Sequence, residues 1–354
     1  MKKHNFSAGP AILPSEVIEQ ASQAVKELDN IGLSLIEISH RSKEFIAIME
    51  EACSLSLNLL GLEGKGYKAM FLQGGASMQF LMTAYNLLEN KAGYVNSGTW
   101  SSKAIKEAKL LGEVEELASS KDQNFNYIPK GYNIPENLDY LHITTNNTIF
   151  GTQYKALPET QVPLVADMSS DIFSRPFDYS KFDLFYAGAQ KNMGPSGVTL
   201  VVIKESSLSK VSRVIPSMLN YEVQANAGSM FNTPPVFPVY TVLLNLRWIA
   251  KNGGLDGIGA YNDKKAALIY EEIDRNPLFE GFANQEDRSQ MNATFNLKDE
   301  SQAEIFDALW NQANISGLKG HRSVGGYRAS IYNALPIESI QTLVDCMQEF
   351  ERKA

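Results

Sequence analysis

An acidic residue and a lysine stand at matching places after two short apolar runs of this chain. Asp167 ends the run PLVAD, and Lys191 comes just after the run DLFYAGAQ. Short apolar runs bounded by turn residues predict buried strands of an α/β sheet, and ligands of such sheets bind at the carboxyl ends of the strands. We therefore expect both side chains to point into one crevice.

A lysine and a carboxylate in one crevice suit the chemistry of pyridoxal phosphate. A lysine amine can form a Schiff base with the cofactor's aldehyde, and a carboxylate beside the pyridine nitrogen keeps that nitrogen protonated, so that the ring accepts electrons. The spacing of Asp167 and Lys191 is commonplace by itself. The small residues around the lysine, at 187–189 and 194–197, leave room for a flat ligand and favour this interpretation.

A glycine pair provides a candidate phosphate site. The run KAMFL at 68–72 predicts a strand, and Gly74 and Gly75 break it before a helix begins. Glycines let the backbone approach an anion, which the free N–H groups of the helix start and the Ser77 hydroxyl can then bind. A tight turn without a ligand is the alternative. The segment is neither a dinucleotide-binding glycine motif nor a P-loop.

Two further positions could contact a flat ligand. Trp100 lies at a loop-to-helix junction among small polar residues, where an indole can stack on a ring, although a single tryptophan is more often part of a core. The segment TTNNTIFGTQY follows a predicted strand at 139–143 and offers the Thr148 hydroxyl. Such a polar cluster is usually only a loop.

Cationic residues gather at two places in an acidic chain. The clusters are His40, Arg41 and Lys43, and then Lys319, His321, Arg322 and Arg328. Arginine binds carboxylate and phosphate groups bidentately, and a neighbouring histidine adds a pH-dependent donor. A substrate with two anionic ends would need two such clusters. The alternative is that each cluster forms a solvated face or a surface ion pair.

Composition excludes several classes of function. The 354 residues include 40 acidic and 32 basic ones, a net charge of -8, which disfavours nucleic acid or an anionic membrane as the main partner. Cys53 and Cys346 lie in separate helical patterns and predict a reducing compartment without disulfides. No apolar run follows the first lysines or reaches about 18 residues. We predict a cytoplasmic protein, and we assign no metal ligands.

Helical patterns alternate with the apolar runs and give an α/β fold class. A helix is expected after Pro14 with Ser15 as its cap, another ends near Gly61, and a third is expected over 240–250. From about Leu255 long apolar runs become fewer, as in an α+β unit. We predict a large domain at 15–254 with a mixed, mostly parallel sheet, and a small α+β domain made of 1–14 and 255–354.

With these residues assembled, the chain resembles the phosphoserine aminotransferases, a family of fold-type I, pyridoxal phosphate-dependent enzymes. The similarity extends over essentially the whole chain. The matching segments are FSAGPAILP, ISHRSKEF, LQGGASMQF, SGTWS, ADMSSDIFSRP, YAGAQKNMGPSG, NTPP and GHRSVGGYRASIYNALP.

The resemblance implies how the cofactor is held. Lys191 would carry it covalently, Asp167 would pair with the pyridinium nitrogen, and Trp100 would stack on the ring. Thr148 and Gln190 would donate or accept hydrogen bonds at its edge.

The resemblance also implies a phosphate pocket that two subunits share, because the family forms homodimers with sites at the interface. Ala76 and Ser77 would hold the cofactor phosphate, and Asn232 and Thr233 would reach it from the neighbouring subunit. Some members have an arginine in place of Ser77, so this pocket would rely more on the His–Arg pairs.

For the substrate, the resemblance implies that Arg328 binds the carboxylate. His40, Arg41, His321 and Arg322 would bind the phosphate, or the side-chain carboxylate of glutamate. The implied reaction converts 3-phosphohydroxypyruvate and glutamate into phosphoserine and 2-oxoglutarate in serine biosynthesis. The phosphorylated substrate 4-phosphohydroxythreonine of pyridoxine biosynthesis would use the same pockets, and the sequence does not decide whether it does.

Two alternatives remain open on the sequence. Another fold-type I enzyme, such as an aminotransferase of a small amino acid or a desulfurase, would keep Lys191 and Asp167. It would not need two His–Arg clusters, and a desulfurase would need a mobile cysteine that neither Cys53 nor Cys346 resembles. A non-catalytic protein on the same scaffold would be expected to lose the lysine or the acid.

Overall fold

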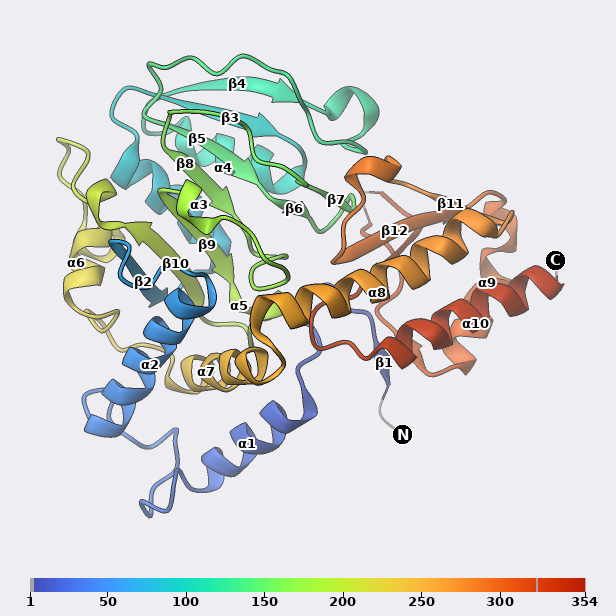
Figure 1. Cartoon of the computed structure of the whole chain (residues 1–354), viewed down its shortest axis with the longest axis horizontal. Coiled ribbons are helices and arrows are strands. Elements are labelled where there is room, and N and C mark those ends of the chain that lie inside the picture. Colours follow the sequence, from blue (N-terminus) through green and yellow to red (C-terminus); the bar gives the residue numbers. More distant parts are fainter. Residues whose placement is uncertain (1–2, 323, 354) are drawn as a thin grey trace.

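A mixed sheet forms the centre of the larger unit in the computed structural model, which describes residues 3–322 and 324–353 (Figure 1). Within these residues the sheet has seven strands in the order β2-β10-β9-β8-β5-β3-β4. They are Tyr67–Leu72 (β2), Thr199–Lys204 (β10), Leu184–Gly188 (β9), Leu164–Asp167 (β8), Tyr140–Thr144 (β5), Lys91–Asn96 (β3) and Glu113–Ser119 (β4). Only β10 runs against its neighbours. The carboxyl ends of β2, β3, β5, β8 and β9 therefore lie at one edge.

Both faces of the sheet are buried, because alternate side chains of each strand point to opposite sides. In β10, Leu200 and Val202 join one hydrophobic cluster, while Val201 and Ile203 join another. The first cluster includes α1 (Ser15–Lys26), α2 (Lys43–Leu59) and α7 (Val236–Lys251), and the second includes α3 (Gly75–Leu87), α4 (Thr99–Ala108) and α6 (Tyr221–Asn226). This arrangement explains why these strands read as nearly continuous apolar runs.

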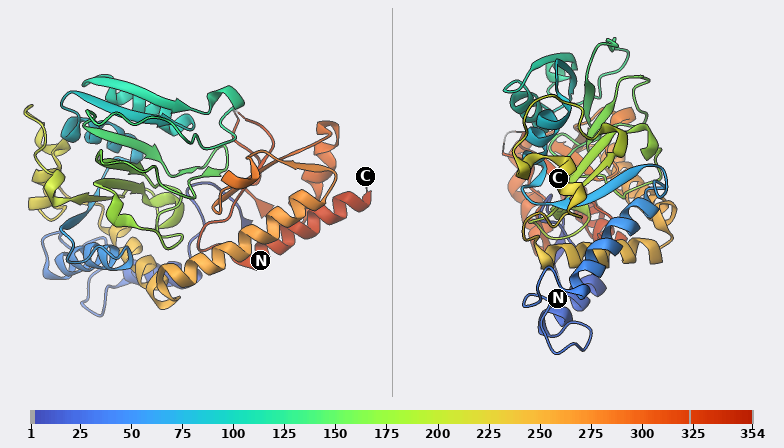
Figure 2. Two further views of the ribbon diagram at one scale, coloured as in Figure 1. Left: turned by 45° about the horizontal axis from the view of Figure 1, so that its top comes forward. Right: turned by 90° about the vertical axis from the view of Figure 1, so that its left-hand side faces the viewer.

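The C-terminal part of the chain has a hydrophobic cluster of its own. It surrounds an antiparallel sheet of β11 (Phe279–Gly281), β12 (Asn292–Leu297) and β14 (Tyr327–Ser330), with α8 (Gly254–Arg275), α9 (Ala303–Gln312) and α10 (Ile337–Lys353). Helices α8 and α10 run side by side (Figure 2).

The N-terminus joins this smaller unit. Strand β1 (His4–Asn5) pairs with β13 (Ile315–Ser316), and Phe6 lies in the same cluster. These contacts support a small domain that includes the first residues, while the boundaries given above stay a prediction.

Three local expectations need correction. Helix α1 begins at Ser15, and its cap is Pro14 without a side-chain hydrogen bond. Helix α7 begins at Val236 instead of Tyr240, because Pro238 falls in its first turn, where the missing N–H breaks no hydrogen bond. Strand β4 was not expected. It lies at the edge of the sheet and alternates glutamates with apolar residues, so no buried run marks it.

No helix in the described part of the chain is both long enough and apolar enough to span a bilayer.

Candidate active site

The loops after β2, β3, β5, β8 and β9 surround a cavity of about 300 Å³ at one edge of the large sheet. Nine of the residues predicted to bind cofactor or substrate line it: Ala76, Ser77, Trp100, Thr148, Asp167, Gln190, Lys191, His321 and Arg328. Because the parallel strands end together, residues from Ala76 to Lys191 reach one site, where His321 and Arg328 of the smaller unit join them.

The remaining predicted residues do not line this cavity. The Asn232 amide approaches the Gln73 side chain at 3.4 Å, and the Thr233 carbonyl accepts a hydrogen bond from Gln73 at 2.9 Å, on the other side of the α3 start. His40 and Arg41 lie between α1 and α2, where Arg41 is exposed. Within one subunit the structure therefore leaves these residues, and the exposed Arg322, outside the cavity.

The charges of Lys191 and Asp167 interact inside the cavity. Lys191 lies in the one-turn helix α5 (Ala189–Asn192), and its amine donates a hydrogen bond to the Thr148 hydroxyl at 2.8 Å. Burial lowers the pKa of Lys191 to about 8; Asp167 opposes this shift, and Arg328 adds to it. Burial raises the pKa of Asp167, whereas Lys191 and a hydrogen bond from the Ser169 backbone lower it. An amine with so low a pKa is a ready nucleophile.

We expect the Lys191 amine of the cofactor-free protein to react with an amine-specific acylating reagent at a rate that rises with pH and levels off above about pH 8. The reason is that only the unprotonated amine is nucleophilic, and here it predominates above pH 8 instead of above the usual 10.5. Peptide mapping by mass spectrometry would measure the rate at this one residue. Because Asp167 raises the pKa of Lys191, the midpoint should move to lower pH in Asp167→Asn. A midpoint near the ordinary lysine value would contradict the burial argument.

The start of α3 is a candidate anion site. Gly74 precedes the helix with a φ of +99°, and a Cβ there would lie 2.5 Å from the Cβ of Met78, so only glycine fits. The backbone N–H groups of Gly75, Ala76 and Ser77 have no intrahelical partner, and these three residues line the cavity. Such a turn binds phosphate groups well.

Buried donors without partners also line the cavity. The indole Nε1 of Trp100 and the Nε of Arg328 are buried and have no hydrogen-bond acceptor among the described residues. Arg328 donates one weak bond, at 3.3 Å, to the Thr148 carbonyl. The Lys191 amine lies 5.5 Å from the centre of the Trp100 ring.

The rim of the cavity carries a cationic cluster. Partial burial lowers the pKa of His321, and Arg328, Arg322 and Lys103 lower it further. Lys103 was missed on the sequence, although it stands one helical turn after Trp100 and its amine lies 4.6 Å from that ring. The sequence analysis also missed Ala8, Gly9 and Ser169 in the lining.

Neither of the two cysteines lines this cavity. Cys53 lies in α2 and Cys346 in α10, and burial raises the pKa of Cys53 to about 12 and that of Cys346 to about 11. Within residues 3–322 and 324–353, no group of three or more His, Cys, Asp and Glu side chains could hold a metal ion.

Comparison with known proteins identifies the family. Residues 3–343 match the model of the aminotransferase class-V family. The phosphoserine aminotransferase of Flavobacterium johnsoniae is 63% identical over 355 residues, with all of both chains covered. The chain belongs to the phosphoserine aminotransferase family.

Solved phosphoserine aminotransferases have the same fold over their full length. The one from Bacillus circulans subsp. alkalophilus is 47% identical, with a TM-score of 0.96 and 99% of both chains covered. The pyridoxal phosphate-bound one from Trichomonas vaginalis is 35% identical, with a TM-score of 0.92, and covers 98% of this chain and all of its own. The predicted α/β fold, with its mixed, mostly parallel sheet and a smaller unit, is thereby confirmed.

Proposed function

We propose that the protein is a cytoplasmic, pyridoxal phosphate-dependent transaminase that moves an amino group between glutamate and 3-phosphohydroxypyruvate, giving phosphoserine and 2-oxoglutarate in serine biosynthesis. The observation that carries the proposal is the pairing of Lys191 with Asp167 in a cavity that has an anion site at one end and cations at its rim. The cofactor, when bound, supplies an aldehyde and an electron-accepting ring.

Lys191 has the properties of the covalent and proton-transferring residue. Its lowered pKa provides an unprotonated amine near neutral pH, and the Thr148 hydroxyl holds the amine in place. With the cofactor bound, Lys191 would hold it covalently, and the same amine would be placed to take a proton from the substrate's α-carbon and to return it. Asp167 would hold the proton on the ring nitrogen.

Separate groups of cationic side chains would bind the two anionic ends of the substrate. Arg328 has an unused Nε donor inside the cavity and would bind the α-carboxylate common to both substrates. His321, Arg322 and Lys103 form the cationic cluster at the rim and would bind the distal phosphate or the side-chain carboxylate of glutamate. The use of 4-phosphohydroxythreonine stays a prediction.

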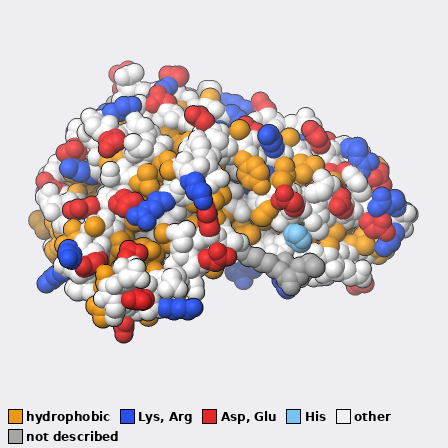
Figure 3. Space-filling view, turned by 60° about the horizontal axis from the view of Figure 1, so that its bottom comes forward, with side chains coloured by type: hydrophobic (Ala, Val, Ile, Leu, Met, Phe, Trp, Pro, Cys, Tyr) orange, Lys and Arg blue, Asp and Glu red, His pale blue; other side chains and the backbone are white. Residues whose placement is uncertain are grey.

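A homodimer would bring in the predicted residues that lie outside the cavity. Large apolar side chains are exposed in α1 and in its connection to α2: Ile18 in the helix, and Ile31, Leu33 and the 62% exposed Ile36 in the connection. Others flank the Asn232 loop: Met78, Met218 and Phe231. Figure 3 shows hydrophobic side chains among charged ones on the face that carries α1. Exposed apolar groups next to His40, Arg41 and Asn232 support an interface at which these residues complete the neighbouring site.

Absorbance spectroscopy tests the reaction in one experiment. Glutamate should remove the visible band of the purified, cofactor-loaded protein, and 3-phosphohydroxypyruvate should restore it. A band that glutamate leaves unchanged would rule out transamination of glutamate, and the absence of any band after reconstitution would rule out the role of Lys191.

Loss of either Arg41 or Arg322 should affect substrate binding more than turnover. We expect Arg41→Ala and Arg322→Ala each to raise KM for the phosphorylated oxo acid about 10- to 100-fold, as loss of a charged hydrogen bond implies, with a smaller fall in kcat. Steady-state kinetics at several substrate concentrations would separate the two effects. Unchanged kinetics in both variants would assign the clusters to surface charge.

Hybrid dimers test whether Arg41 acts across the interface. We would mix Lys191→Ala with Arg41→Ala under conditions that exchange subunits. If the sites are shared, each hybrid has one site with both lesions and one intact site, so activity at low substrate rises above that of either parent. No gain on mixing would place Arg41 in its own subunit's site or outside any site.

A further inference from the structure

One face of the smaller antiparallel sheet is polar and lies against the large unit. Alternate side chains of β12 and β14 point to opposite faces of this sheet. The residues of one face belong to the hydrophobic cluster of the smaller unit: Ala293, Phe295, Tyr327 and Ala329. The residues of the other face, which we call the polar face, are Asn292, Thr294, Arg328 and Ser330. The side chain proposed to bind the substrate carboxylate, Arg328, is therefore part of a polar surface within the protein.

Segment 146–150 of the large unit forms hydrogen bonds with the polar face. The Asn146 amide donates to the side-chain oxygen of Asn292 at 2.8 Å, and the Thr294 hydroxyl donates to the Phe150 carbonyl at 3.0 Å. The other hydrogen-bonding atoms of both amides also have partners. These three side chains are each at most 5% exposed, so water cannot replace a partner that is lost. The two hydrogen bonds therefore fix the smaller sheet on this segment.

Arg328 contacts the same segment at Thr148, which stands midway between the residues that make these two bonds. The guanidinium donates to the Thr148 carbonyl at 3.3 Å, and the Thr148 hydroxyl accepts a hydrogen bond from the Lys191 amine at 2.8 Å. A bond of 3.3 Å is too weak to hold a long side chain in place. The Nε of Arg328 has no partner among the described residues. The position of Arg328 relative to Lys191 therefore depends on the stronger bonds beside it.

We propose that Asn292 and Thr294 position Arg328 for the carboxylate of the substrate. They hold the smaller sheet in one place on segment 146–150, so that the guanidinium stays at a fixed distance from the Lys191 amine. The identity of the ligand rests on the proposed function, whereas the placement of Arg328 is a property of the protein alone. Asn292 and Thr294 do not line the Lys191 cavity, so both are positioning residues that act through Arg328.

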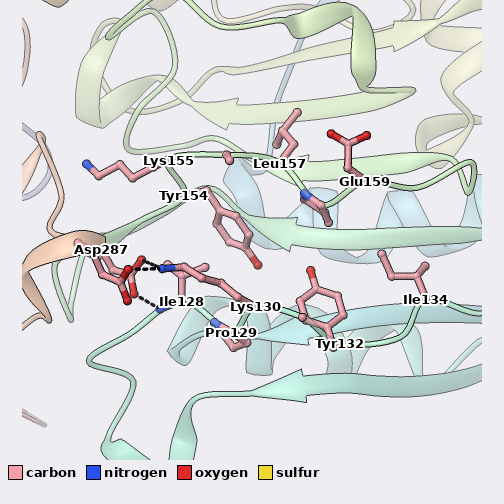
Figure 4. Close-up of a pocket in the computed structure, with 14 residues that line it drawn as sticks. Ile128, Pro129, Lys130, Tyr132, Ile134, Tyr154, Lys155, Leu157, Glu159 and Asp287 are labelled. Carbon is pink, nitrogen blue, oxygen red and sulfur yellow. Dashed lines mark hydrogen bonds and ion pairs between the residues drawn. The ribbon is translucent and has the colours of Figure 1, made fainter.

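A second set of contacts joins the two units at residues that do not line the Lys191 cavity. The Asp287 carboxylate accepts a hydrogen bond from the Ile128 N–H at 3.0 Å and pairs with the Lys130 amine at 2.9 Å (Figure 4). Lys130 is exposed and pairs also with Glu286 at 3.1 Å. Lys130→Ala would therefore weaken the contact between the units without changing the polar face. It is the matched control for a general loosening of the two units.

Stopped-flow absorbance of the glutamate half-reaction, with the pyridoxal phosphate-loaded protein, tests the effect on substrate. Thr294→Val keeps the shape of the side chain without its hydroxyl, and Asn292→Leu removes the amide. We expect each to raise the glutamate concentration for half-maximal rate about three- to tenfold, with less than about a twofold change in the limiting rate. Thr294→Ser keeps the hydroxyl and should restore the parent value, and Lys130→Ala should keep it. Parent values in both variants, or an equal effect of Lys130→Ala, would overturn the proposal.

A double-mutant cycle tests whether the effect passes through Arg328. In the Arg328→Ala background, Thr294→Val should cause no further loss of kcat/KM for glutamate, because the group that it positions is already absent. A purely structural role of Thr294 would instead lower kcat/KM by the same factor in both backgrounds. That additive result would overturn the proposal.

Acylation of Lys191 in the cofactor-free protein tests the placement of Arg328 without any substrate. Arg328 lowers the pKa of Lys191, so Thr294→Val should move the midpoint of the acylation rate to higher pH, toward that of Arg328→Ala. Lys130→Ala should keep the parent midpoint. A parent midpoint in Thr294→Val would overturn the placement. A parent protein that does not react with glutamate would overturn the proposed function, and the acylation midpoints would still decide the placement.

Discussion

Lys191→Ala is expected to abolish transamination while the protein stays folded. The substitution removes both the covalent attachment and the proton transfer, and the loss should be about 10⁴-fold or more in kcat. The amine makes one hydrogen bond, to Thr148, and its burial costs stability. Thermal unfolding and circular dichroism should therefore remain close to those of the parent. The rate would be measured by following 2-oxoglutarate formation.

Two control variants distinguish the loss of the reacting amine from the loss of a positive charge or of folding. Lys191→Arg keeps a positive charge in the cavity, but a guanidinium cannot lose its proton and should be equally inactive. Lys210→Ala removes an exposed lysine and should leave the rate unchanged. More than trace activity in either Lys191 variant would contradict the assigned role.

Asp167→Asn should give the second largest effect, a fall in kcat of about 10²- to 10³-fold. Asparagine keeps the shape of the side chain but has no charge with which to hold a proton on the ring nitrogen. Asp167 is 3% exposed, so water cannot replace the missing charge. Stopped-flow measurement of the glutamate half-reaction would isolate the proton-transfer step.

The direction of the accompanying pKa change provides an independent check on Asp167. The Asp167 carboxylate raises the pKa of Lys191. Loss of this carboxylate should therefore shift the acidic limb of the pH–rate profile to lower pH. Asp167→Glu retains the charge and should keep the parent limb. A variant with parental kcat and an unshifted limb would show that the carboxylate does not interact with the reacting groups.

The residues at the centre of the site could be predicted from the sequence, because they follow strands that are buried on both faces. Asp167 ends β8, and Lys191 follows the neighbouring strand β9, so two apolar runs were enough to place them together. Parallel pairing with β5 then adds Thr148 by the same rule.

Other parts of the site could not be placed from the sequence, although His321 and Arg41 were among the candidates. Lys103 and His321 come together only when the smaller unit packs against the large sheet, and no local pattern records that contact. Arg41 lies exposed between α1 and α2, and its proposed role would need a second subunit, which the pattern of one chain does not record.

Residues 8–11 contact both structural units close to Lys191. Ala8 accepts a hydrogen bond from the Tyr332 hydroxyl, while the Ala11 N–H donates to the Gln190 carbonyl at 2.9 Å. Between them, Gly9 brings backbone so near Lys191 that an added Cβ would lie 3.4 Å from its Cγ. Rotation of the smaller unit would therefore move residues 8–11 relative to the Lys191 side chain. Hydrogen–deuterium exchange at the Ala11 amide would measure how often this segment separates from the Gln190 carbonyl.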